Sequence, residues 1–139
     1  MRLSPYGTLY DMSDSDPVAL FTYVLSELSR RGIAYVHVIE PRASLAGGQD
    51  GTNASAPRTA EIFRKAFSGA LISAGGYDRA EAMRAVESGT ADAVAFGRLF
   101  IANPDLPERL RSGADLNAYN RATFYGGGEK GYTDYPRAS

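Results

Sequence analysis

Short apolar runs recur along the chain, and each is followed by a polar or glycine-containing turn. Three of these runs, over 34–39, 70–74 and 91–96, predict buried parallel strands. Between them, hydrophobic residues return every three or four positions, which is the spacing of an amphipathic helix. Strands that alternate with helices imply a parallel sheet with right-handed crossovers, so the predicted fold class is α/β.

The first predicted helix has clear boundary signals. Pro17 suits the first turn of a helix, and Asp14, Ser15 or Asp16 is placed to cap it. Gly32 follows two arginines and predicts the end of this helix.

Further helices are predicted closer to the C-terminus. A short one covers 59–67, and another begins at Asp78, where Glu81 follows three residues later in capping-box spacing. Short helical turns are expected through 103–111, and the tail from 117 is rich in glycine and tyrosine and predicts irregular structure.

Two of the strands end at glycines, in Gly75-Gly76 and in Gly97-Arg98. A backbone can approach a ligand closely at a glycine, and two consecutive βα turns with exposed N–H groups and an arginine make a phosphate cradle. A (β/α)8 barrel commonly holds phosphate in the loops after its seventh and eighth strands. Because 139 residues are too few for a barrel of about 250, the pattern predicts the C-terminal part of such a barrel.

Composition narrows the classes of function. The formal net charge of −1 gives no electrostatic drive toward nucleic acid or an anionic membrane, and the tyrosine-rich tail has no basic face. There are no cysteines and only one histidine, so no disulfide and no metal site is predicted. The chain has neither an apolar run of about 18 residues nor a signal-peptide pattern, so the prediction is no membrane partner and a cytoplasmic location.

Three polar residues near the first predicted strand have more than one interpretation. His37 lies inside an apolar run, which favours a core histidine over a catalytic base. Glu40 and Arg42 follow the C-terminal end of that strand, where barrel chemistry is found. They are equally compatible with pairing to each other or to a neighbouring loop.

Six motifs in the same order resemble the old yellow enzyme family. They are Arg2–Pro5, Tyr35–Arg42, Ser73–Tyr77, Ala93–Arg98, Ala102–Asp105, and Phe124–Gly128 with Gly131–Pro136. Members of this family are FMN-dependent ene-reductases that use NADH or NADPH and are built on a (β/α)8 TIM barrel. The resemblance implies that residues 1–139 form the C-terminal, FMN-binding part of such a barrel, with about three parallel strands, their helices and an irregular tail.

The resemblance also implies cofactor contacts. Arg2 would lie beside the pyrimidine edge of the isoalloxazine, where a fixed guanidinium stabilises the anion of reduced flavin. The FMN phosphate would be held by Gly75, Gly76, Gly97 and Arg98, through backbone N–H groups and a charged fork.

The C-terminal tail would complete this chain's part of the site. By the resemblance, Phe124 packs near the dimethylbenzene side of the flavin and Tyr125 faces the substrate pocket. No catalytic residue is expected in this chain, because the groups that polarise the substrate and donate the proton come from the earlier half of the family's barrel.

Two hypotheses follow for function. In the first, the chain is part of an FMN-dependent NAD(P)H oxidoreductase that reduces the activated C=C bond of a small α,β-unsaturated carbonyl or nitro compound. It would pair with an N-terminal half-barrel or self-associate. In the second, it is a truncated, non-catalytic fragment that binds flavin or phosphate. A sugar-phosphate isomerase or aldolase half-barrel shares the phosphate turns but explains neither the Arg2 loop nor the Phe124–Tyr125 tail.

Overall fold

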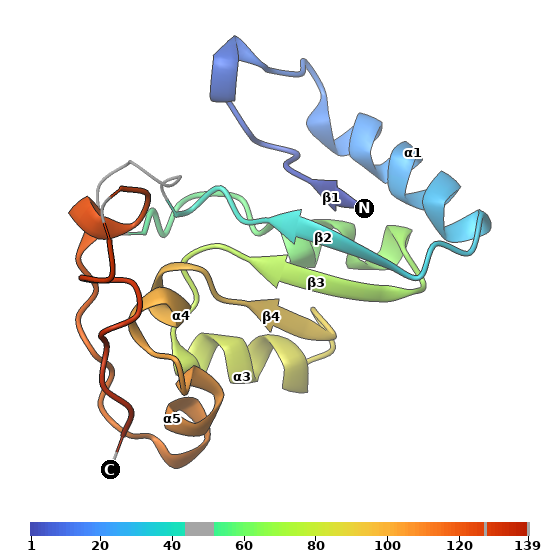
Figure 1. The fold of residues 1–139 in the computed structure, drawn as a ribbon. Coiled ribbons are helices and arrows are strands. Elements are labelled where there is room, and N and C mark those ends of the chain that lie inside the picture. The colour runs from blue at the N-terminus through green and yellow to red at the C-terminus, as the bar shows by residue number, and fades with distance from the viewer. Residues whose placement is uncertain (44–51, 127, 139) are drawn as a thin grey trace. The chain divides into compact units, whose positions relative to one another are not determined.

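The computed structural model describes residues 1–43, 52–126 and 128–138, in two compact units, Met1–Ala95 and Phe96–Ser139. The first unit holds a parallel sheet whose strands lie side by side in chain order (Figure 1). These strands are β1 (Arg2–Leu3), β2 (Tyr35–Ile39), β3 (Ala70–Ala74) and β4 (Ala93–Ala95).

The three predicted strands are confirmed as β2, β3 and β4, and β1 is an addition. β1 is too short to give a hydrophobic pattern of its own and is defined by its partner. Arg2 is in register with His37 and Leu3 with Val38, and the His37 amide donates to the Met1 carbonyl oxygen at 2.7 Å. Two residues therefore add a fourth strand to the sheet.

The helices of the first unit are η1 (Leu9–Asp11), α1 (Pro17–Arg30), α2 (Thr59–Phe63), η2 (Arg64–Ala66) and α3 (Arg79–Glu87). Asp16 is the residue that caps α1, and its carboxylate accepts from the Ala19 amide at 3.0 Å. The predicted capping box of α3 is present, with Asp78 and Glu81 each bonded to the other's backbone. The helix predicted over 59–67 is divided, because its second half tightens into η2.

The core of this unit lies between one face of the sheet and the helices α1 and α2. Val36, Val38 and Leu71 supply the sheet side, and Leu25 and Phe63 are among the helix residues packed on it. Along β2 and β3 the side chains alternate between buried and partly exposed. The strands are thus buried on one face, not on both as the apolar runs predict.

The second unit contains α4 (Arg98–Ala102), α5 (Leu106–Ser112) and η3 (Arg121–Thr123). The buried Arg109 organises it, since its guanidinium donates to Asp105 Oδ1 at 2.8 Å and also to the carbonyl oxygens of Asp115 and Pro136. These bonds hold the irregular tail against α5. Across the described residues of both units, no helix is long and apolar enough to cross a membrane.

Candidate cofactor site

The turn after β3 has the backbone that the phosphate prediction requires. Gly75 has φ +124° and Gly76 has φ +69°, values that favour glycine. A Cβ at Gly75 would lie 2.7 Å from the Glu40 carbonyl oxygen, and one at Gly76 would lie 2.8 Å from Thr52 Cγ2. At Gly75 a side chain would meet backbone that cannot move aside, whereas at Gly76 it would meet the exposed Thr52 side chain, so the positive φ is the main reason for glycine there.

Glu40 acts within the fold. Its buried carboxylate accepts from the backbone amides of Thr59 and Ala60, at 2.8 and 3.0 Å, and from Ser73 Oγ at 3.0 Å. It therefore satisfies two of the amides that a helix N-terminus leaves without partners, at the start of α2. Of the alternatives left open by the sequence, the structure favours a bond to a neighbouring segment.

Arg42 is also engaged by neighbouring segments. Its Nη1 donates to Glu81 Oε1 at 2.8 Å and its Nε to the Gly75 carbonyl oxygen at 3.1 Å. The hydrogen bond from Arg42 is the largest cause that holds the pKa of Glu81 below its ordinary value. Sequence reasoning assigned Glu81 only to the cap of α3. The available signal for this network was an arginine, Arg42, three residues after the end of a predicted strand.

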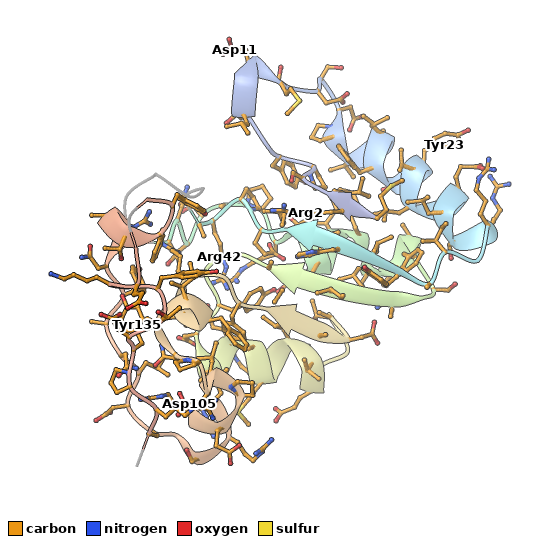
Figure 2. All side chains as sticks on the ribbon, in the orientation of Figure 1. Arg2, Asp11, Tyr23, Arg42, Asp105 and Tyr135 are labelled. Atoms are coloured by element: carbon orange, nitrogen blue, oxygen red, sulfur yellow. The ribbon has the colours of Figure 1, made fainter. Side chains whose placement is uncertain are left out.

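Arg2 lies beside a cavity of about 610 Å³ at the carboxyl ends of β1 and β2. Tyr6, Ile39 and Glu40 are among the other lining residues. Figure 2 shows Arg2 on β1 and Arg42 beyond the end of β2. The predicted flavin arginine is therefore exposed beside a cavity large enough to hold part of a cofactor.

His37 is half-buried in β2, on the sheet face opposite the core. Burial first, and then the charge of Arg2, lowers its pKa. Among the described residues its Nε2 is buried without a hydrogen-bond partner. The structure thus places a neutral imidazole beside Arg2, and not the satisfied core histidine that the sequence favours.

Gly97 and Arg98 belong to the second unit and begin α4. Gly97 is the N-cap residue with φ −97°, and a Cβ built on it meets no described atom within 4 Å. The Arg98 guanidinium lies 5.8 Å from the centre of the Tyr119 ring. The negative φ of Gly97 is therefore accessible to other residues, whereas its ψ of −81° lies outside the usual helical and extended regions.

Phe124 and Tyr125 follow η3 and differ in exposure. Phe124 is buried against Tyr119, with ring centres 5.5 Å apart, and meets Tyr125 edge-on. Tyr125 is 80% exposed. Within its own unit, Phe124 is a packed residue, whereas Tyr125 is free to contact another molecule.

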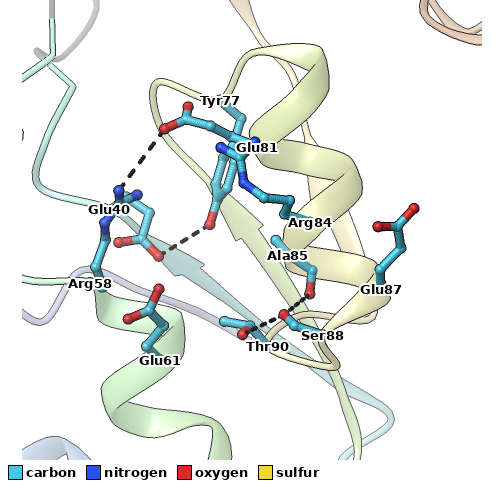
Figure 3. Close-up of a pocket in the computed structure, with 10 residues that line it drawn as sticks. All are labelled: Glu40, Arg58, Glu61, Tyr77, Glu81, Arg84, Ala85, Glu87, Ser88 and Thr90. Carbon is cyan, nitrogen blue, oxygen red and sulfur yellow. Dashed lines mark hydrogen bonds and ion pairs between the residues drawn. The ribbon is translucent and has the colours of Figure 1, made fainter.

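A second cavity of the first unit, of about 540 Å³, lies between α2 and α3 (Figure 3). Its wall includes the carboxylates of Glu61, Glu81 and Glu87, with Arg58 and Arg84, and the Tyr77 hydroxyl points to Glu40. None of the predicted cofactor residues lines it, so it is not the predicted site.

The first unit thus combines a parallel sheet, a turn that favours glycine, and a cavity lined by Arg2 and Glu40 at the carboxyl ends of its strands, which is where α/β barrel enzymes bind their ligands. Residues 1–117 match the model of the NADH:flavin oxidoreductase / NADH oxidase family, and the chain belongs to this family.

Among its relatives, 12-oxophytodienoate reductase 1 of Oryza sativa subsp. japonica is 48% identical over 139 residues, which cover 98% of this chain and 35% of that protein. 12-oxophytodienoate reductase 2 of Arabidopsis thaliana is 45% identical over 137 residues, with 98% and 36% covered. The chain therefore spans about a third of the length of the relatives it matches.

Solved structures of the same family are also similar to this chain. Morphinone reductase in complex with tetrahydroNAD matches with a TM-score of 0.83 and 47% identity over 99% of this chain and 35% of that one. The old yellow enzyme from Trypanosoma cruzi matches with a TM-score of 0.83 and 36% identity over 99% and 34%. These matches confirm the resemblance to the old yellow enzyme family and the assignment of the fold to part of a TIM barrel.

Proposed function

We propose that this chain supplies the FMN phosphate site and part of the substrate pocket of an FMN-dependent NAD(P)H oxidoreductase that reduces activated C=C bonds. The observation that carries the proposal is the Gly75–Gly76 turn at the carboxyl end of β3, where positive φ values and close packing favour glycine. Because glycine has no side chain, a ligand can closely approach the backbone of such a turn. The family and the cavity beside Arg2 support the same function.

Each predicted residue has a role in this proposal. Bound FMN would supply hydride transfer between NAD(P)H and the alkene. Arg2 would stabilise negative charge on the reduced flavin, because a fixed guanidinium is a preorganised electrostatic partner. The two glycine turns and Arg98 would bind the phosphate, and the Phe124–Tyr125 segment would border the flavin and the substrate.

A partner follows from the same reasoning. The groups that polarise the alkene and donate the proton are expected outside these 139 residues. The sheet also has one face that its own helices leave partly exposed, with Tyr35 49% exposed. We therefore propose an N-terminal half-barrel as the partner, or self-association through this face, in the cytoplasm.

Flavin uptake tests the proposal. The purified chain, alone and mixed with the first two thirds of morphinone reductase, is incubated with FMN and passed through gel filtration. Flavin absorbance that is retained in the mixture only, together with NADH or NADPH oxidation in the presence of 2-cyclohexen-1-one, is the expected result. Flavin retained by the chain alone supports a phosphate cradle that folds independently. No retention in either sample favours the alternative, a non-catalytic fragment.

Two arginine variants test whether Arg98 has a specific role in FMN binding or only contributes positive charge. R98M should weaken FMN binding about tenfold to a hundredfold, because a hydrogen bond to a charged group contributes about 1.5–3 kcal/mol. R31M removes an exposed arginine at the end of α1 and should leave FMN binding unchanged. Equal losses in both variants would contradict a specific role for Arg98.

A further inference from the structure

Arg42 lies where three segments of the first unit meet. Its side chain is only 4% exposed, although it lies in the loop three residues after the end of β2. It donates to the Gly75 carbonyl oxygen and to the Glu81 carboxylate, and its guanidinium lies over the Tyr77 ring, 4.6 Å from the ring centre. One side chain therefore connects the end of β2, the glycine turn and the first turn of α3.

The glycine turn needs such a connection. Glycine has the largest backbone freedom of any residue, so two glycines in succession keep a single conformation only where neighbouring groups hold them. The bond from Arg42 Nε to the Gly75 carbonyl oxygen is one such contact, and Nε would also lie 3.7 Å from a Cβ at Gly76. The guanidinium thus binds Gly75 and lies beside the place that a side chain at position 76 would take.

The arrangement uses properties of arginine that lysine lacks. A planar guanidinium donates in fixed directions and stacks on an aromatic ring, whereas an ammonium does neither. Among the described residues, Arg42 Nη2 is buried without a hydrogen-bond partner.

We propose that Arg42 is a positioning residue, which holds the Gly75–Gly76 turn in the conformation that receives the FMN phosphate. It acts through the turn and not by contact with the cofactor. The inference rests on the proposed function for the role of the turn, whereas the contact between Arg42 and the turn is independent of it.

The matched control is Arg64, a second arginine that binds backbone beside β3. Its Nη1 donates to Asp92 Oδ2 at 2.6 Å and its Nη2 to the Gly69 carbonyl oxygen at 2.8 Å. Gly69 directly precedes β3, whereas Gly75 directly follows it. R64M therefore removes a comparable network from the opposite end of the same strand.

The first test measures order in the turn without any ligand. Backbone ¹⁵N relaxation on the 139-residue chain should give rigid Gly75 and Gly76 amides, with order parameters of about 0.85. R42M should lower these two order parameters below about 0.6. R42K should have the same effect, because lysine lacks the planar guanidinium and its fixed donor directions. R64M should leave them unchanged. Unchanged order in R42M would overturn the proposal. If R42M does not fold, R42K decides.

The second test separates the phosphate from the ring system. Dissociation constants for FMN and for riboflavin, which lacks the phosphate, are compared in the mixture with the first two thirds of morphinone reductase. R42M should weaken FMN binding about tenfold and leave riboflavin binding unchanged. Equal losses for both ligands, matched by R64M, would show a merely structural role and overturn the proposal.

The two tests distinguish this inference from the proposed function. A wild-type mixture that binds FMN no better than riboflavin would refute the phosphate site and, with it, the role of Arg42 toward the cofactor. The relaxation measurement would still decide whether Arg42 holds the turn.

Discussion

The two glycine turns, at Gly75–Gly76 and at Gly97, differ in the reason why glycine occupies them. At Gly75 the backbone has positive φ and a neighbouring carbonyl oxygen stands where a side chain would begin. At Gly97 φ is negative, although ψ is an unusual −81°, and no described atom lies within 4 Å of where a Cβ would be. The first turn is therefore specified by the fold around it, whereas the second has no such reason among the described residues, and a ligand that approaches it closely would provide one. Glycine at the first turn is thus explained by the fold, which leaves the backbone groups of the turn for the proposed phosphate, whereas glycine at the second turn would be explained by the close approach of a ligand.

The largest effect is expected from a serine at the first turn, which tests whether the fold requires glycine there. G75S should lower the free energy of unfolding by about 3 kcal/mol, since a strained φ and an overpacked Cβ each cost about 1–3 kcal/mol. Urea unfolding followed by circular dichroism measures the change. A stability equal to that of the wild type would show that the turn tolerates a side chain.

Acid titration tests the ion pair that accompanies the first turn. The pKa of Glu81 is lowered in the folded chain, so its stabilising contribution is present above the ordinary pKa of a glutamate. That contribution is lost as the pH falls through the lower pKa of the folded state. E81Q should therefore flatten the fall in unfolding free energy below about pH 4.5.

The control for this titration is E87Q, an exposed carboxylate on the same helix. Urea unfolding at pH 3, 4, 5 and 7 compares the two variants with the wild type. A pH dependence that E81Q and E87Q reduce equally would contradict a specific contribution from the bond between Arg42 and Glu81.

The smallest expected effect on stability is that of a serine at the second turn. Serine is a favourable N-cap residue and the negative φ of Gly97 is accessible to it, whereas the ψ of −81° is unusual, so G97S should lower the unfolding free energy by no more than about 1 kcal/mol, less than G75S. If FMN approaches this backbone, the added side chain should weaken its binding more than about tenfold. Isothermal titration with FMN in the reconstituted mixture measures this, and normal affinity would remove Gly97 from the proposed site.

The sequence predicts those parts of the fold that local signals encode. The three apolar runs were found as β2–β4, and Asp16 and the Asp78–Glu81 capping box begin their helices as expected. Local signals are short-range, so the sequence of Arg2–Gly7 is typical only of a strand end and its loop, and Arg2 and Leu3 form a strand because β2 lies beside them. The five-residue α4 was missed for a similar reason, since it is too short for a helical period.

The candidate site shows the same limit. The glycines at 75 and 76 were identified from sequence because their position after a strand is itself a signal. The Arg42 network was not, because Arg42 is separated by 33 residues from Gly75 and by 39 from Glu81. Hydrogen bonds between side chains so far apart depend on how the strands are placed, and no pattern along the chain encodes them.

The shortness of β1 has a consequence for the proposed chemistry. Alternate side chains of a strand point to opposite faces of its sheet, so a slip of one residue in the pairing of β1 with β2 would exchange Arg2 for Leu3 beside the cavity. The redox potential of a flavin bound there would then depend on strand alignment, because the nearby positive charge would be replaced by an apolar side chain. The alignment of one two-residue strand would thus help to determine how readily the flavin accepts electrons.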